Sequence, residues 1–111
     1  IVSKVENKKK VIDTSGKLSI EQIASLLKRA DLLISLDSAM AHVCAQTNTP
    51  VIVLLGSDPL NCFPWTNKRI MLFHPEVCSG CRVFVCPEGD NICMKTIRVS
   101  EVFDAATKFL K

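Results

Sequence analysis

The chain has 111 residues, 48% of them hydrophobic and 23% charged, and a formal net charge of +3. That length suits one small domain and is short for a two-domain enzyme. Its apolar runs are too short to span a membrane. Its basic residues are scattered except at residues 8–10, and no interleaved aromatics indicate nucleic-acid binding. We expect a single domain, residues 1–111, belonging to a longer or processed polypeptide because the chain begins at Ile1 rather than at a methionine.

The first predicted elements are a short strand and an amphipathic helix. Val11 and Ile12 form an apolar pair before a turn at residues 13–16, whose sequence is Asp-Thr-Ser-Gly. Ser19 and Gln22 match a capping box, in which each side chain bonds the backbone N–H of the other residue. The apolar positions that follow have the spacing of one helical face: Ile20, Ile23, Ala24 and Leu27. These features predict a helix over residues 19–29.

Two short apolar runs, residues 32–36 and 51–55, predict strands of a parallel sheet that is covered on both faces. Residues 38–47 between them predict a helix that ends at Asn48 as C-cap, before Pro50. Its buried stripe is expected to comprise Met40, Val43, Cys44 and Thr47. A strand, helix and strand this close together require a right-handed crossover, which brings the ends of both strands to one edge of the sheet.

The second half of the chain predicts one more strand, at residues 69–73, and a closing helix capped by Ser100. The buried face of this helix is expected to comprise Phe103, Ala106 and Leu110, flanked by Val102 and Phe109. Trp65 lies in a Pro-containing loop, where it serves as a packing plug or, alternatively, as a stacking platform for a base or sugar. The whole pattern indicates an α/β fold, a Rossmann-like parallel sheet with flanking helices.

The turn at residues 37–42, Asp-Ser-Ala-Met-Ala-His, carries the most chemistry. Asp37 or Ser38 can cap the following helix. The N–H groups of Ala39, Met40 and Ala41 would then lie unpaired at the positive end of the helix dipole, where phosphate groups bind. His42 lies four residues after Ser38, hence on the same helical face, and can donate a hydrogen bond. These features predict an anion-binding turn at the edge of the sheet.

Asp37 argues against a bare phosphate as the ligand of this turn, because a carboxylate repels anions. It fits a ligand that carries hydroxyl groups beside its phosphates, as a nucleotide sugar does. The alternative that the spacing leaves open is a capped helix with a surface histidine.

The chain resembles the C-terminal part of the glycosyltransferase family 9 enzymes, the ADP-heptose:lipopolysaccharide heptosyltransferases. Their signature is Asp, Ser or Thr, Gly, two variable residues and His at the end of an apolar strand, and Asp37, Ser38 and His42 match it. The resemblance covers residues 11–110 and includes these further segments: 13–19, 30–35, 49–51, 55–59, the cysteine cluster ending in Cys93-Met94, and the closing helix. Ala39 departs from the glycine of the signature, and Met40-Ala41 stands where the family often has Pro-Met.

The resemblance implies a GT-B architecture, with two Rossmann-like domains and the active site in the cleft between them. This chain would be the incomplete C-terminal half, which binds the nucleotide sugar. Residues 37–42 would hold the diphosphate and sugar of an ADP-sugar, with the N–H groups of Ala39 and Met40 on phosphate oxygens. His42 would neutralise the diphosphate leaving group. The catalytic base would lie in the other domain, so the chain alone should not catalyse.

The reaction that the resemblance implies is inverting transfer of a heptose, or a related sugar, to a lipopolysaccharide core acceptor held by the other domain. It implies no required cofactor and no metal. It also implies a bacterial, cytoplasmic protein that can act at the inner face of the inner membrane, with at most peripheral membrane association and no nucleic-acid partner.

A cysteine-rich loop at residues 78–93 has the spacing C-x2-C-x4-C-x6-C, formed by Cys78, Cys81, Cys86 and Cys93. Four thiols this close together can bind zinc, although the spacing matches neither a zinc ribbon nor a ferredoxin. Disulfides and reduced thiols are the other interpretations, and the bacterial cytosol implied by the resemblance argues against disulfides. The alternative function is a non-catalytic protein-binding module stapled by zinc.

Overall fold

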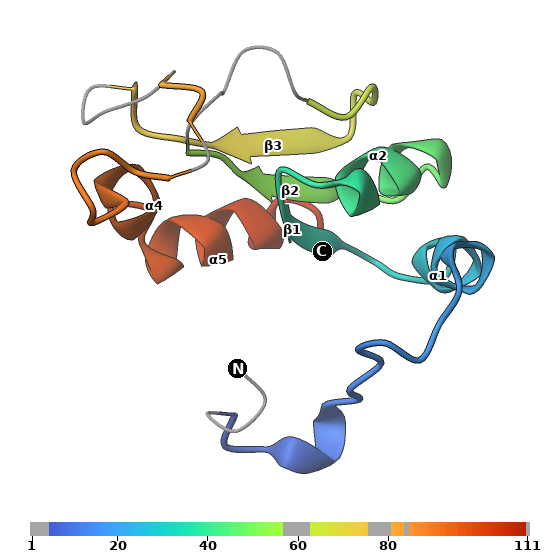
Figure 1. Ribbon diagram of the computed structural model, residues 1–111. Coiled ribbons are helices and arrows are strands. Elements are labelled where there is room, and N and C mark those ends of the chain that lie inside the picture. Colours follow the sequence, from blue (N-terminus) through green and yellow to red (C-terminus); the bar gives the residue numbers. More distant parts are fainter. Residues whose placement is uncertain (1–4, 57–62, 76–80, 84, 111) are drawn as a thin grey trace.

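The computed structural model describes residues 5–56, 63–75, 81–83 and 85–110. The elements, in chain order, are the 3-10 helix η2 (Lys8–Lys10), α1 (Ile20–Leu27), β1 (Leu33–Leu36), α2 (Ala39–Gln46), β2 (Val51–Leu54), β3 (Arg69–Leu72), α4 (Ile92–Lys95) and α5 (Val99–Thr107). In Figure 1, α1 lies next to α2, while α4 precedes α5 on the other side of the molecule. The stretch before α1, drawn in blue, lies apart from the sheet.

The strands form one parallel three-stranded sheet in the order β1-β2-β3. Leu33 of β1 lies opposite Val51 of β2, which in turn lies opposite Arg69 of β3. Because all the strands are parallel, their carboxyl ends meet at one edge of the sheet. The sheet and its helices confirm the predicted α/β fold class.

Helices cover both faces of the central strand β2, so the protein has a helix–sheet–helix arrangement. One core joins β2 to α1 and α2 and consists of Leu27, Ala41, Cys44, Val51, Val53 and Leu55. The other core joins β2 to α5 and consists of Ile52, Ala105 and Ala106. Residues along β2 alternate between the two cores because successive side chains of a strand point to opposite faces.

The predicted capping box of α1 is confirmed. The Ser19 Oγ accepts a hydrogen bond from the backbone N–H of Gln22 at 3.3 Å, and Gln22 Oε1 accepts one from the N–H of Ser19 at 2.9 Å. At the other end, the buried hydroxyl of Thr49 donates to the carbonyl of Leu27 at 2.6 Å. This bond satisfies a helix-end carbonyl and fixes α1 to the connection between α2 and β2.

The strand expected at Val11 and Ile12 is wrong: neither residue is in a strand, and Ile12 is 87% exposed. Two apolar residues give too short a run to define a strand. β1 also differs from its prediction, because one of its faces is only partly covered. Ile34 and Leu36 are 49% and 57% exposed, since α5 makes its main strand contacts with β2 and β3.

The face and the start of α5 differ from the prediction as well. The helix begins at Val99, with Arg98 as N-cap, so Ser100 is not its cap. Ala105 and Ala106 form its buried face, whereas Phe103 is 68% exposed. Small residues suffice at this face because they let the helix approach the sheet closely.

Two further packing predictions are corrected by the structure. The buried centre of α2 is Ala41 together with Cys44, and Met40 is only half-buried. Trp65 is 84% exposed, so it is not a packing plug; the adjacent Pro64 is buried in its place. The C-cap of α2 is Thr47 rather than the predicted Asn48, which follows it in the left-handed conformation with φ 62°. Throughout the described part of the chain, no helix has the length and apolar character needed to cross a membrane.

Candidate functional site

A cavity of about 270 Å³ lies at the carboxyl edge of the sheet. The ends of β1 and β2 form one side of it through Leu36, Asp37, Leu54 and Gly56. The other side comes from the segment of residues 81–94, which includes α4. Side chains that follow parallel strands therefore meet a loop far along the chain, as expected for the ligand-binding edge of an open α/β sheet.

Gly56 allows the close approach between the end of β2 and α4. A Cβ atom at this position would lie 3.0 Å from the Sδ of Met94 and 3.2 Å from the Sγ of Cys93. Real Cβ atoms rarely show such close contacts, so any larger residue would require the side chains of Met94 and Cys93 to shift. The glycine thus lets these two cavity-lining residues approach the end of β2.

The N-terminus of α2 is open. Ser38 occupies the N-cap position, but its side chain makes no capping hydrogen bond. Its Oγ lies 3.0 Å from the Oγ of Ser35, and the Ser35 hydroxyl donates to the carbonyl of Leu36 at 2.8 Å. Because a hydroxyl has one hydrogen, Ser38 must be the donor to Ser35. The Ser38 side chain is thereby turned away from the helix that it precedes.

This arrangement leaves backbone donors available. The prediction is wrong for Ala41, whose N–H donates to the Ser38 carbonyl at 3.0 Å, whereas no partner within the described residues accepts from the N–H of Ala39 or Met40. Both groups lie at the positive end of the helix dipole. The structure therefore differs from the alternative of a capped helix, because the cap is missing.

The predicted site residues do not all meet in the cavity. Asp37 is exposed and lines it, whereas Ser38, Ala39, Met40 and His42 are not among its lining residues. His42 is exposed on α2, one turn beyond Ser38, and next to Ala41, which is only 1% exposed and fixes the helix on the sheet. The structure thus gives two adjoining parts: a cavity that reaches Asp37, and an open helix end with an exposed histidine.

Three of the four clustered cysteines, Cys81, Cys86 and Cys93, line the cavity as free thiols. Cys78 lies outside the described residues. Within the described ranges no group of three or more His, Cys, Asp or Glu side chains is arranged to hold a metal ion. The zinc-stapled module therefore gains no support from the part of the cluster that can be placed.

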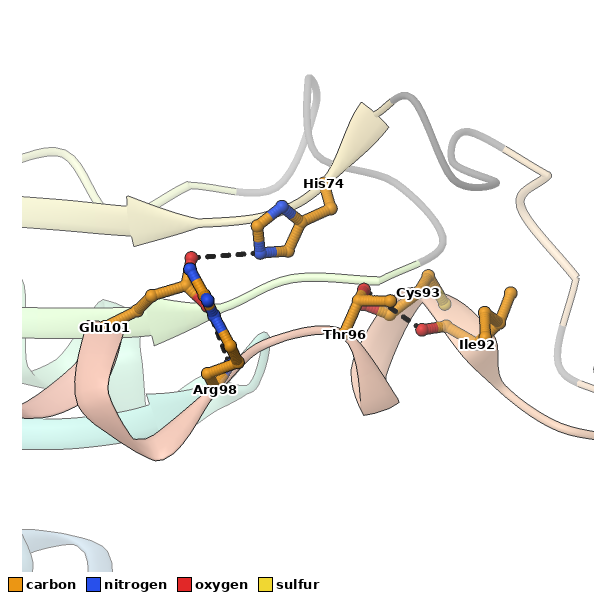
Figure 2. A network of polar contacts seen from close by, with 6 residues as sticks. All are labelled: His74, Ile92, Cys93, Thr96, Arg98 and Glu101. Atoms are coloured by element: carbon orange, nitrogen blue, oxygen red, sulfur yellow. Dashed lines mark hydrogen bonds and ion pairs between the residues drawn. The ribbon is translucent and has the colours of Figure 1, made fainter.

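Two separate sets of polar contacts that the sequence did not reveal lie at α4 and α5 (Figure 2). His74 Nε2 lies 3.1 Å from Glu101 Oε1. The hydroxyl of Thr96, between the two helices, lies 3.1 Å from the carbonyl oxygen of Ile92 and 3.2 Å from that of Cys93. The first contact joins the segment after β3 to α5, and the second closes the C-terminal end of α4.

The sequence analysis also missed the wall residues themselves, among them Asn91, Ile92 and Met94. The only signal for them was Gly56 directly after an apolar strand, since an isolated glycine often marks a close approach of another segment. Nothing in the sequence indicated which segment approaches.

Comparison with known proteins identifies the family. The sequence model of glycosyltransferase family 9 (heptosyltransferase) matches residues 1–92. The chain belongs to glycosyltransferase family 9. This confirms the predicted family, whose fold is GT-B, and agrees with the parallel sheet and flanking helices.

Several curated bacterial proteins are similar to this family 9 chain. It is 38% identical over 60 residues to lipopolysaccharide heptosyltransferase 3 of Escherichia coli, covering 53% of the chain and 18% of the relative. It is 27% identical over 104 residues to lipooligosaccharide heptosyltransferase 2 of Campylobacter jejuni, covering 92% of the chain and 33% of the relative. It is 37% identical over 54 residues to the lipopolysaccharide core heptosyltransferase OpsX of Haemophilus influenzae, covering 48% of the chain and 16% of the relative.

These matches cover a third or less of each relative's length. No solved structure matches the chain significantly.

Proposed function

We propose that this chain is the donor-binding part of a glycosyltransferase that transfers a heptose, or a related sugar, from an ADP-sugar to a lipopolysaccharide core acceptor. The observation that carries the proposal is the uncapped N-terminus of α2 directly after Asp37, in a chain that belongs to glycosyltransferase family 9. In this proposal residues 1–111 form an incomplete C-terminal nucleotide-sugar-binding domain, with the cysteine-rich loop at residues 78–93.

The proposed ligand contacts follow from the available groups. The free N–H groups of Ala39 and Met40 bind oxygens of the diphosphate, aided by the helix dipole. His42 donates a further hydrogen bond to the diphosphate, while Asp37 accepts hydrogen bonds from hydroxyl groups of the sugar. The charge of Asp37 then favours a sugar-bearing ligand over free ADP, because the carboxylate repels the phosphates unless a hydroxyl intervenes.

The proposed reaction is inverting displacement at the anomeric carbon. The acceptor hydroxyl forms the new C–O bond, the bond to the diphosphate breaks, and ADP leaves with the electron pair. The hydrogen bonds of the α2 N-terminus and of His42 stabilise the negative charge that develops on the leaving oxygen. The base that takes the acceptor proton is assigned to another domain, which also holds the acceptor, so the chain alone binds without catalysing. The step requires no metal or other cofactor from this chain.

The proposal also includes a setting for the protein. We place it in the bacterial cytoplasm, acting at the inner face of the inner membrane with at most peripheral association. Its partners are then the nucleotide-sugar donor and the lipopolysaccharide core acceptor, and no nucleic acid.

Binding measurements on the purified chain test the donor site. Titration calorimetry with ADP and with an ADP-sugar should show weak binding, of about millimolar dissociation constant, or about −4 kcal/mol. His42→Ala should weaken both ligands. Asp37→Ala should weaken the ADP-sugar while leaving ADP binding unchanged or stronger, because it removes a sugar contact and a repulsive charge.

Two controls separate specific effects from general ones. Asp104→Ala removes an exposed carboxylate on α5, and Gln46→Ala removes an exposed side chain at the far end of α2; neither should change binding. An absence of heat with both ligands, or equal effects of Asp37→Ala and Asp104→Ala, would refute the donor site.

A further inference from the structure

The cavity at the sheet edge has an unusual wall, because three free thiols line it together. Cys81 is exposed, while Cys86 and Cys93 are partly buried. The remaining described cysteine, Cys44, is fully buried in the core under α2. Among the described cysteines, solvent therefore reaches the three thiols of the cavity but does not reach the thiol of Cys44.

The segment that follows Cys86 folds back around it. Gly89 and Asn91 adopt left-handed conformations, with φ of 74° and 52°. The N–H of Gly89 donates to the carbonyl of Cys86 at 3.0 Å, and Asp90 Oδ1 accepts from the N–H of Ile92 at 3.1 Å. These bonds close residues 86–92 into a tight turn, which holds Cys86 at the wall of the cavity.

The backbone of residues 88–91 in this turn lies close to the Cys86 side chain. Backbone hydrogen bonding from Asn91 lowers the pKa of Cys86, partial burial opposes it, and residues 88–90 add smaller contributions in the same direction as Asn91. By contrast, burial raises the pKa of Cys44. A thiolate, not a thiol, is the nucleophile in thiol chemistry. The turn thus favours the reactive form of Cys86 at the opening of a cavity that is large enough for a small reagent.

We propose that this cavity is a thiol-modification site, in which Cys86 attacks small disulfides and a neighbouring cavity thiol, Cys81 or Cys93, resolves the product. In the first step the Cys86 sulfur forms a bond to one sulfur of the reagent. The S–S bond of the reagent breaks, and its other half leaves as a thiolate that takes a proton from water.

In the second step a neighbouring thiolate attacks the Cys86 sulfur and expels the remaining half of the reagent. The two protein sulfurs are oxidised to one disulfide, and the reagent disulfide is reduced to two thiols. The products fill or close the cavity that reaches Asp37. If the proposed donor site is correct, on which this consequence rests, modification lowers its affinity for an ADP-sugar.

The test uses oxidised glutathione and the purified chain at neutral pH, with a chelator present. Brief exposure is followed by alkylation and peptide mass mapping. Cys86 should react first, about tenfold faster than Cys81, although Cys81 is the more exposed thiol. Cys44 should not react until the protein is unfolded. Equal rates at Cys81 and Cys86, or a faster reaction at Cys81, would mean that exposure alone governs reactivity and would overturn the proposal.

Variants of the chain separate the two steps. Cys86→Ser should abolish the fast reaction, whereas Cys44→Ser should leave it unchanged. With Cys81 and Cys93 both replaced by Ser, the glutathione adduct on Cys86 should persist, while the unmodified chain should release glutathione and gain an internal disulfide. A persistent adduct in the unmodified chain would exclude the resolving thiol.

The role of the turn can be tested at Gly89. A Cβ atom there meets nothing within 4 Å, so Gly89→Ala strains only the left-handed backbone. It should slow the reaction of Cys86 without changing that of Cys81. If the reaction occurs only when the chelator is present, the thiols hold a metal and the proposal fails. Because every readout is a thiol modification, the result is independent of whether the chain binds ADP.

Discussion

The Nε2 atom of His74 lies 3.1 Å from Oε1 of Glu101, which joins the end of β3 to the first turn of α5. The other carboxylate oxygen of Glu101 accepts hydrogen bonds from the backbone N–H of Arg98 at 2.8 Å and from its Nε at 3.3 Å. The side chains of His74 and Glu101 are 23% and 24% exposed. One carboxylate thus fixes the start of the helix that packs under β2.

Glu101→Gln tests this contact through its dependence on pH. Backbone hydrogen bonding from Arg98 holds the pKa of Glu101 below its ordinary value, with the Arg98 side chain and the charge of His74 contributing less and partial burial opposing them. A carboxylate with a lowered pKa stabilises the fold above its ordinary pKa, and that stabilisation is lost as the pH falls through the lowered value. The variant should therefore unfold at lower urea concentration than the wild type at neutral pH, and the difference should vanish in acid.

Asp104→Asn is the matched control on the same helix, because the Asp104 side chain is exposed and makes no ion pair within the described residues. It should leave the urea midpoint unchanged at neutral pH. If the deficit of Glu101→Gln stayed constant from neutral to acid pH, the carboxylate charge would not be its cause.

The two serines that precede or begin helices should differ in their contributions to stability. Ser19 accepts the capping hydrogen bond of α1, and removing it in Ser19→Ala should cost about 1 kcal/mol of unfolding free energy. Ser100 lies inside α5 rather than at its cap, so Ser100→Ala should change the unfolding free energy by less than about 0.5 kcal/mol. Urea denaturation of both variants measures the contrast, and an equal loss would contradict the assigned caps.

The comparison of Ser19 with Ser100 illustrates what the sequence could predict. Ser19 belongs to a reciprocal pair with Gln22, and such local signals define a helix start without knowledge of the rest of the fold. Ser100 matched only the preference for serine at caps, while α5 starts at the local pair of Arg98 and Glu101, whose first member is not a typical capping residue. Local hydrogen bonds could be predicted where both residue types are typical of a cap, whereas the added contact of Glu101 with the distant His74 could not.

The same limit applies to the faces of the sheet and to the site. Apolar strands predicted burial on both faces, yet which strand a helix covers depends on where it crosses the sheet, so Ile34 of β1 stays half-exposed. At the candidate site, the strand–turn–helix pattern indicated Asp37 and the N-terminus of α2. The wall that faces Asp37 comes from residues 81–94, and nothing in the sequence pattern brings that wall to the sheet.

Two phenylalanines of the C-terminal region test the observed face of α5. Phe109 packs partly buried against the core of Ile52, and Phe109→Ala should cost about 2 kcal/mol, less than the 3–5 kcal/mol typical of full burial. Phe103 is 68% exposed, and Phe103→Ala should change the unfolding free energy by less than about 0.5 kcal/mol. Thermal or urea unfolding of the two variants checks this order. A larger loss for Phe103→Ala than for Phe109→Ala would instead support the face predicted from the sequence, in which Phe103 is buried.

The contact between Gly56 and Met94 makes a final prediction about the cavity. In Gly56→Ala the new Cβ atom would lie 3.0 Å from the Met94 Sδ, so the methionine side chain, which lines the cavity, must shift. We expect a loss of about 1 kcal/mol in unfolding free energy, as for moderate overpacking, together with weaker ADP-sugar binding. Met94→Ala removes the atoms that clash, so adding it to Gly56→Ala should cost less than the sum of the two single losses.

A double-mutant cycle in urea measures this coupling. Gly16→Ala is the matched control: Gly16 has φ 67° and no atom within 4 Å of an added Cβ, so its loss comes from backbone strain alone. Combined with Met94→Ala it should be additive, because the two positions share no contact. Additivity at Gly56 as well would show that the β2 end and α4 do not meet as described. Coupling at Gly56 but not at Gly16 would show that the missing side chain of Gly56 makes room for Met94 beside the end of β2.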